Sequence, residues 1–307
     1  MPAAASTGTD NRAGAVDARS AEPLFNLDDT RLLGIGVPES MVEPVAALRT
    51  QPELIAMEPR LPIEAYEALM LIRALVPEGQ NDLFFVGDGH QRIYRRRAVM
   101  GRCGIRIVGR ALKLKINYRT TEQIRRFASA VLDGQRIDDL DGGEDCSTDY
   151  LSLTHGPDAT LAGFDDEAAE IRWIVEHVRA LADDDGSLAH CCVLLRTREL
   201  RDRYARAIAE TGLELVMLDA RADDQTVPGI RVANMHRVKG LEFRHVVIAA
   251  MNHGIVPNRL AVGGSDDLTE LRDRELAERA LLHVCASRAI ETLAVTWNGA
   301  ASEYLAR

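Results

Sequence analysis

Apolar and polar residues alternate in blocks along the second half of the chain. Apolar runs of about four to eight residues indicate buried strands, and apolar residues that recur every three or four positions indicate helices. The predicted strands are 150–153, 191–195, 213–218, 230–234, 246–250 and 292–297, and the predicted helices are 166–181, 199–211 and 271–286. This alternation is typical of an α/β fold in which a parallel sheet carries helices on both faces.

The first half of the chain carries a weaker pattern. Leu112, Leu114 and Ile116 alternate with two lysines and predict a half-exposed strand. Thr120 or Thr121 is expected to cap a helix that ends before Gly134, and residues 82–88 predict a short buried strand. The pattern divides the chain into a disordered lead (1–23), a helical segment (24–78), a first α/β part (79–137), an acidic linker (138–149) and a second α/β domain (150–307).

The chain is acidic overall, with a formal net charge of −10. This charge argues against a protein that coats nucleic acid generally. Arg and Lys nevertheless crowd between Arg92 and Arg119, a stretch that contains no Asp or Glu. The stretch suits a localised phosphate contact, and the alternative is a solvated charged face.

Cysteine usage and hydropathy bear on the cellular compartment. The five cysteines are scattered and form no C-x-x-C pair, so zinc sites and disulfide frameworks are not predicted. Cys191 and Cys192 lie in an apolar run and are expected to be buried thiols, which fits a reducing cytoplasm. Nothing resembles a signal peptide or a membrane span, so we expect a cytoplasmic protein without a membrane partner.

Polar residues precede the strand predicted at 246–250. Residues 235–243 read MHRVKGLEF and predict a loop with a tight glycine turn, which would place His236, Lys239 and Glu242 at one end of the sheet. Polar groups at such an edge are typical of a ligand site on an open α/β sheet. The alternative is a strand with a polar lead-in.

Three further segments accompany this one. Residues 87–94 read GDGHQRIY, residues 117–119 read NYR, and residues 278–289 read ERALLHVCASRA. Together the four segments resemble the motor motifs of the UvrD/Rep family of superfamily-one DNA helicases, and the resemblance covers roughly residues 81–307. It implies a RecA-like fold in which 79–137 is the remnant of a first motor domain and 150–307 is the second. It also implies ATP and Mg²⁺ as cofactors and single-stranded or duplex-junction DNA as partner.

The resemblance assigns one group of residues to the nucleotide. Gln91 would contact the γ-phosphate or the attacking water, and Asp88 would help to order the site. Arg119 would bind the γ-phosphate, for which the planar guanidinium is well suited. Glu242 would reach the nucleotide sugar or the phosphate network, and Arg288 would act as the arginine finger.

A second group is assigned to DNA by the same resemblance. Tyr94 would offer an aromatic face to a base, and Arg97 belongs to the same motif. His236, Arg237 and Lys239 would face the DNA backbone, where Gly240 would permit close approach.

The sequence departs from the family in the DNA-stacking motif and in the last motif. The family usually has an aromatic residue where this chain has Arg96, and Arg-Gly-Ala where residues 97–99 read RAV. Ser287 stands where Thr is more usual. The base-stacking part of the site is therefore altered.

Two parts of the family's ATPase are missing from this sequence. It contains no Gly-Lys dipeptide and hence no G-x-x-x-x-G-K-[ST] phosphate loop. No apolar strand ends in the Asp-Glu pair that holds magnesium, and Asp166-Glu167 is expected to open a helix instead.

We therefore expect a truncated UvrD-like ATP-dependent 3′–5′ DNA helicase that retains the ATP-sensing and DNA-contacting motifs. The chain alone is not expected to hydrolyse ATP, and a separate chain is a conceivable source of the missing half. One alternative is a non-catalytic module that binds single-stranded DNA or a protein through Arg92–Arg119. Another is a decayed helicase remnant.

Overall fold

The structure is a computed structural model of the chain. It describes residues 65–76, 78–79, 82–85, 88–91, 93, 100–110, 112–138, 144–145, 150–183, 186–218, 223–224, 226–264 and 267–305. The chain divides into two compact units, Met1–Phe84 with Arg102–Ile105 and Phe85–Gly101 with Arg106–Arg307. The predicted lead at 1–23 and most of the predicted helical segment at 24–78 lie outside the described residues.

The described part of the first unit is small. It contains helix α3 (Ala65–Leu75) and the last two residues of the 3₁₀ helix η4 (Met100–Cys103). Arg73 of α3 forms an ion pair with Asp82 at 2.7 Å. Residues 82–85 do not form the predicted strand, and residues 86–87 of that run lie outside the described part.

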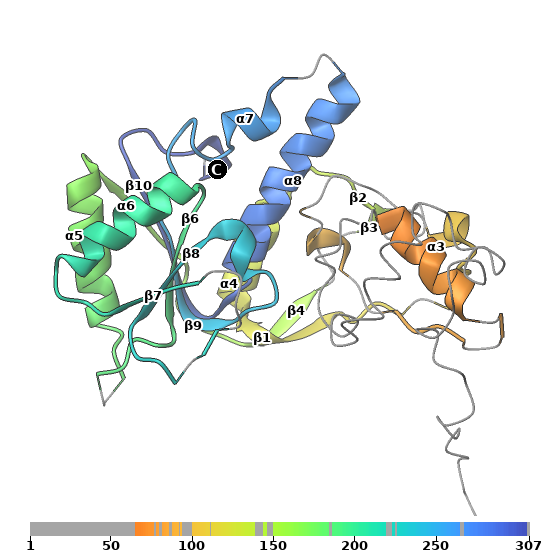
Figure 1. Cartoon of the computed structure of the whole chain (residues 1–307), viewed down its shortest axis with the longest axis horizontal. Helices are drawn as coiled ribbons and strands as arrows, with labels where there is room; N and C mark the ends of the chain where they lie inside the picture. Colours follow the sequence, from red (N-terminus) through yellow and green to blue (C-terminus); the bar gives the residue numbers. More distant parts are fainter. Residues whose placement is uncertain are drawn as a thin grey trace, which may run out of the picture. The chain divides into compact units, whose positions relative to one another are not determined.

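Six parallel strands form the central sheet of the second unit (Figure 1). Their order is β5 (Thr160–Phe164), β10 (Ala289–Asn298), β9 (Phe243–Ile248), β6 (Cys191–Leu195), β8 (Ile230–Asn234) and β7 (Leu215–Met217). All five neighbouring pairs are parallel. The predicted α/β, RecA-like fold class is confirmed.

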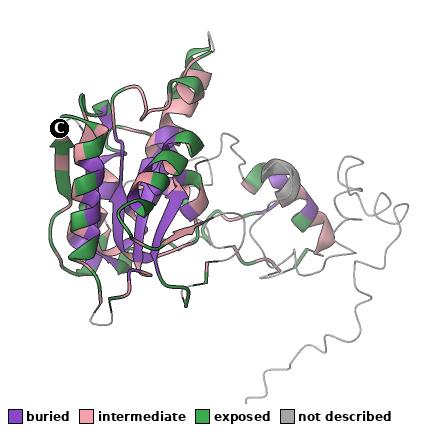
Figure 2. Ribbon diagram, turned by 60° about the vertical axis from the view of Figure 1, so that its left-hand side comes forward, coloured by how far each residue is buried: buried purple, intermediate pink, exposed green. Residues whose placement is uncertain are grey.

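Side chains that alternate along the strands build a core on each face of the sheet. In β6, Cys191, Val193 and Leu195 pack with α5 (Glu167–Arg179) and α6 (Arg198–Ala209). Cys192 and Leu194 point the other way and pack with α8 (Leu268–Ala286). Figure 2 shows that the buried residues concentrate in the strands and on the helix faces turned toward them. The prediction of helices on both faces is therefore confirmed.

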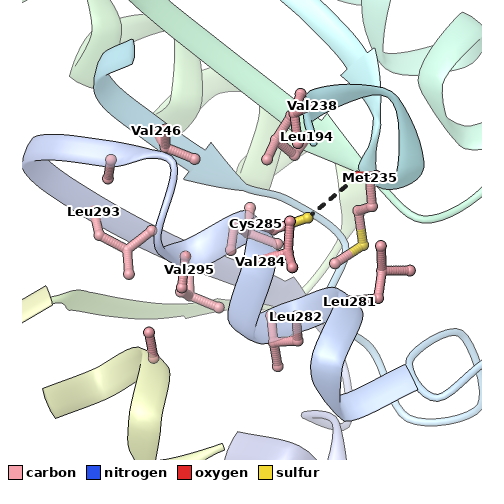
Figure 3. Close-up of a cluster of buried hydrophobic side chains, with 14 of the residues drawn as sticks. Leu194, Met235, Val238, Val246, Leu281, Leu282, Val284, Cys285, Leu293 and Val295 are labelled. Carbon is pink, nitrogen blue, oxygen red and sulfur yellow. Dashed lines mark hydrogen bonds between the residues drawn. The ribbon is translucent and has the colours of Figure 1, made fainter. Parts of the chain in front are cut away.

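The 3₁₀ helix η6 (Met235–Val238) covers part of the sheet on the α8 side. Met235 and Val238 are buried in the same cluster as Leu281 and Cys285 of α8, and the Cys285 thiol donates to the Met235 carbonyl at 3.5 Å (Figure 3). The segment that carries the MHRVKGLEF sequence is therefore anchored by apolar side chains, which leaves its polar residues nearer the surface.

A two-stranded parallel sheet adjoins the main sheet. β1 (Ile116–Thr121) pairs with β4 (Leu151–Thr154), and helix α4 (Glu122–Ala130) follows β1 directly. The Thr121 hydroxyl caps this helix by accepting from the Ile124 amide at 3.4 Å, which confirms one of the two predicted caps. The predicted strand is displaced, because β4 begins opposite Ile116 and residues 112–115 are not part of a strand. Asn117, Tyr118 and Arg119 consequently lie inside β1 rather than after it.

The remaining elements are short connections. They are η3 (Gly89–Gln91), the antiparallel pair β2 (Ile137–Asp138) and β3 (Glu144–Asp145), α7 (Arg259–Val262) and η7 (Glu303–Leu305). The four described cysteines are free and buried, and burial raises the pKa of the Cys191 thiol to about 12. No helix among the described residues is long and apolar enough to span a membrane.

Candidate functional site

Two candidate residues lie at the amino-terminal edge of neighbouring strands. Glu242 immediately precedes β9 and Arg288 immediately precedes β10. The two strands are in register at Phe243 and Ala289, and the Phe243 amide donates to the Arg288 carbonyl at 3.0 Å. Parallel pairing therefore brings together two residues that are 46 positions apart in the sequence.

Arg288 is almost completely buried, with 2% of its surface exposed. Its Nε donates to the Val284 carbonyl at 3.1 Å, and its Nη1 donates to the Leu241 carbonyl at 3.4 Å. Its Nη2 donates to the Ser287 hydroxyl at 3.1 Å and to Gln91 Oε1 at 3.4 Å. The guanidinium is thus held in one orientation, and Gln91 covers it on one side.

Arg119 reaches the same edge from β1. Its Nη2 lies 2.6 Å from Glu242 Oε1, and the two side chains are 47% and 39% exposed. The Asn117 side chain accepts from the Arg119 amide at 2.8 Å, which fixes the backbone beneath the arginine. Burial lowers the pKa of Arg288, and the charge of Arg119 lowers it further while Glu242 and Asp88 oppose the shift. Arg288 is therefore close enough to Arg119, Glu242 and Asp88 to interact with them electrostatically.

Asp88 organises the turn that carries Gln91. Its Oδ1 accepts from the His90 amide at 2.9 Å, and its Oδ2 accepts from Gln91 Nε2 at 2.8 Å. Burial would raise the pKa of Asp88, but the hydrogen bonds from His90 outweigh it and hold the pKa at about 2. The carboxylate therefore stays ionised at neutral pH and orients the Gln91 amide.

The structure thus brings all five predicted nucleotide residues, Asp88, Gln91, Arg119, Glu242 and Arg288, to one edge of the sheet. Two guanidinium groups and one amide side chain on the same edge of the sheet suit an anionic phosphoryl group. In the described part of the chain, no cluster of three His, Cys, Asp or Glu residues could hold a metal ion. The roles of the five residues stay predictions.

The predicted DNA-contacting residue His236 does not share this edge. His236 follows β8 at its carboxyl-terminal end, whereas Glu242 precedes β9 at its amino-terminal end. The register places Arg231 of β8 level with Val246 of β9, since both pair with Cys192. At about 3.3 Å per strand residue, the end of β8 at Asn234 and the start of β9 at Phe243 are roughly 20 Å apart along the strand direction. The expectation that His236, Lys239 and Glu242 lie at one end of the sheet was therefore wrong, because the segment between parallel strands must cross the sheet.

The turn within this crossing segment has the predicted glycine. Lys239 has φ −61° and ψ 124°, Gly240 has φ +88°, and the Leu241 amide donates to the Val238 carbonyl at 3.0 Å. These angles describe a type II turn, which needs a residue that tolerates positive φ. His236 is exposed and Arg237 and Lys239 are partly exposed, while Tyr94 and Arg97 lie outside the described residues.

An ion pair that the sequence reasoning missed lies at the carboxyl-terminal edge. Arg196, directly after β6, donates from Nε to Glu278 of α8 at 2.9 Å and from Nη2 at 2.5 Å. Glu278 also accepts from the Asn258 amide at 3.0 Å, and the Asn234 side chain donates to the Arg196 carbonyl at 3.0 Å. A polar residue at the end of the apolar run 191–195 was the available signal, although nothing indicated its partner.

The chain is similar to a known protein family and to a solved structure. A family model described as the UvrD-like helicase C-terminal domain matches residues 112–222 and 213–300, which together span more than half of the chain. Among solved structures, the chain is similar to the C-terminal domain of a possible DNA helicase from Lactobacillus plantarum WCFS1. The two are 20% identical, the match covers 62% of this chain and 93% of the other, and the TM-score is 0.43. No curated protein matches the chain.

Proposed function

Because the chain belongs to the UvrD-like helicase C-terminal domain family, we propose that it is the γ-phosphate-sensing part of an ATP-dependent 3′–5′ DNA helicase. The observation that carries the proposal is the meeting of Arg119, Glu242, Gln91 and Arg288 at the amino-terminal edge of β9 and β10. Phosphoryl transfer depends mainly on positioning and on the stabilisation of negative charge. Two arginine side chains, whose planar guanidinium groups can donate paired hydrogen bonds to phosphate oxygens, meet that need.

The two arginines would serve this site in different ways. Arg288 is buried and tethered to carbonyl groups, so it presents a fixed positive charge. Arg119 is half exposed and is paired with the Glu242 carboxylate, so it can exchange that partner for a phosphate oxygen. Gln91 lies beside Arg288 and would orient the group that attacks the γ-phosphate.

ATP fits these residues through its phosphate groups and would supply the phosphoryl group that is transferred. Magnesium is assigned to no residue of this chain, since no cluster suited to a metal occurs among the described residues. We propose that the phosphate-loop lysine and the magnesium carboxylates come from a separate chain. His236, Arg237 and Lys239 would contact the DNA backbone away from the nucleotide residues.

A non-catalytic DNA-binding module is the second candidate. The stretch before α4 exposes Leu112, Leu114 and Tyr118 by 92%, 80% and 72%, and Lys113 and Lys115 alternate with the leucines. Aromatic and apolar side chains interleaved with cations suit a single strand, whose bases stack while its phosphates meet positive charge.

ATP turnover by the purified chain, with magnesium and with or without single-stranded DNA, tests the first proposal. We expect turnover no higher than that of Arg288→Ala, because the chain lacks the phosphate loop. DNA-stimulated turnover that Arg288→Ala abolishes would show instead that the chain is a complete motor.

Titration with labelled single-stranded DNA at several salt concentrations separates the two candidates. Binding that weakens steeply with salt and is lost when Lys113 and Lys115 are both changed to Ala would favour the module. Binding that depends on His236 and Arg237 would favour the helicase part. Absence of binding at low salt would contradict both.

A further inference from the structure

Two histidines, one buried and one partly buried, lie close together near Gln91 and Arg288. His90 lies in η3 and is 8% exposed, and His283 lies on α8, one turn before Ser287 and Arg288. The centroids of the two imidazole rings are 6.0 Å apart. The Tyr150 ring meets His90 edge-on at 5.9 Å, so the histidines are enclosed by η3, α8 and the residue before β4.

Hydrogen bonds connect this pair to Gln91. His283 Nδ1 lies 2.9 Å from the Ala128 carbonyl of α4, and it must carry a hydrogen because a carbonyl oxygen only accepts. His90 Nδ1 lies 3.2 Å from Asp88 Oδ1, and the other oxygen of that carboxylate holds the Gln91 amide. Contacts therefore run from α4 through both histidines and Asp88 to Gln91, whose Oε1 accepts from Arg288.

We propose that His283 is a positioning residue for the γ-phosphate-sensing site, which it serves by holding the turn of Asp88, His90 and Gln91 on α8. The inference rests on the proposed function. When His283 is neutral, the turn packs against α8, and the side-chain carbonyl of Gln91 accepts a hydrogen bond from Arg288. A proton on the partly buried His283 ring displaces the turn and separates Gln91 from Arg288.

The charges around His283 give the direction of the pH dependence. Burial lowers the pKa of His283, and electrostatic interactions with His90 and Arg288 lower it further. The Ala128 carbonyl and the Asp88 carboxylate oppose this shift, and Tyr150 faces the pair from the side of β4. Because the imidazolium forms only below the ordinary histidine pKa of about 6.5, the positioning is complete at neutral pH and is lost on acidification.

The test is an NMR titration of the full chain from about pH 8 to pH 5, a range in which histidines change charge. The His283 ring, the Gln91 side-chain amide and the Arg288 Nε–H are followed together. We expect the Gln91 and Arg288 signals to shift with the midpoint of His283. In His283→Gln, which keeps a donor for the Ala128 carbonyl but takes up no proton, this shift should disappear.

A matched control is His177→Gln on α5. Burial also lowers the pKa of His177, whose ring stacks on Trp173 at 4.6 Å. This variant should leave the Gln91 titration unchanged. Gln91 and Arg288 signals that stay constant while wild-type His283 titrates would overturn the inference, even if His283→Gln did not fold.

Measuring ATP binding by the same samples distinguishes a failure of the proposed function from a failure of the positioning role of His283. We expect affinity to fall on acidification in the wild type and to fall less in His283→Gln. Absence of ATP binding at every pH, with Gln91 still following His283, would contradict the proposed function and leave the positioning role intact. ATP binding whose pH profile is the same in both proteins would contradict the positioning role alone.

Discussion

The two edges of the sheet each carry an arginine–glutamate pair, and the pairs differ in burial. At the carboxyl-terminal edge, the side chains of Arg196 and Glu278 are 11% and 6% exposed and meet through two hydrogen bonds. At the amino-terminal edge, Arg119 and Glu242 are 47% and 39% exposed, with one contact of 2.6 Å. The first pair links a strand end to α8, while the second joins β1 to the start of β9 across water-accessible surface.

This difference separates a structural pair from one that can exchange partners. A buried ion pair whose partner is removed leaves an uncompensated charge in the protein interior. An exposed pair contributes little to stability, because water and salt solvate either charge alone. The Arg119–Glu242 pair is therefore the one from which a ligand phosphate can recruit an arginine at low cost.

The largest expected effect comes from Glu278→Ala. The change leaves the buried Arg196 guanidinium without its carboxylate partner and removes the acceptor of the Asn258 amide. We therefore expect a loss of about 3–5 kcal/mol in the free energy of unfolding. Urea unfolding measures it, and Glu278→Gln should lose less because it keeps an acceptor. A loss below about 1 kcal/mol would mean that the Arg196–Glu278 pair contributes no more to stability than an exposed ion pair does.

A smaller effect is expected from pH at the amino-terminal edge. His245 of β9 is 6% exposed, and its Nδ1 lies 2.8 Å from the Thr292 hydroxyl. Burial lowers the pKa of His245, Glu291 and Asp183 oppose the shift, and His190 and Arg244 add to it.

A histidine whose pKa is lowered by folding binds more protons in the unfolded chain. Its contribution to stability is complete above about pH 6.5 and is lost as the pH falls below that value. Urea midpoints measured between about pH 8 and 5.5 should therefore fall less steeply in His245→Asn than in the wild type. The exposed His253 at the opposite edge is the control. If the urea midpoint of His253→Asn depended on pH as weakly as that of His245→Asn, the pH dependence could not be attributed to His245.

The smallest effect on stability is expected from Arg119→Ala. The exposed pair with Glu242 should contribute about 0–1 kcal/mol. Arg203→Ala is the matched control, since Arg203 and Glu167 form a similarly exposed pair at 2.7 Å between α6 and α5. Both variants should unfold at nearly the wild-type urea concentration. A loss above about 2 kcal/mol in Arg119→Ala alone would mean that its pair is structural.

The sequence predicted those parts of the fold that are buried on both faces or marked by caps. β6 is a continuous apolar run because helices cover both sides of it. Helix α5 begins where Asp166 accepts from the Ala169 amide at 2.7 Å, as its acidic start indicated. The edge strand β5 was missed, because it pairs only with β10 and none of its residues is fully buried.

The resemblance to the helicase family pointed to Gln91, Arg119, Glu242 and Arg288, which the structure brings together, and their roles stay predictions. It could not show that η6 crosses the sheet, since that follows from the parallel pairing of β6, β8 and β9. It also gave no sign of Arg196 pairing with Glu278, because the two residues are 82 positions apart and meet only through tertiary packing.

The central claim is that the amino-terminal edge holds the phosphates of ATP. Its most direct test is calorimetric titration of ATP into the wild-type chain, Arg119→Ala and the matched Arg203→Ala. We predict that Arg119→Ala weakens binding by about tenfold or more, the cost of losing one charge-assisted hydrogen bond to a phosphate, while Arg203→Ala binds like the wild type. Equal affinities of all three proteins, or no binding by the wild type, would contradict the account.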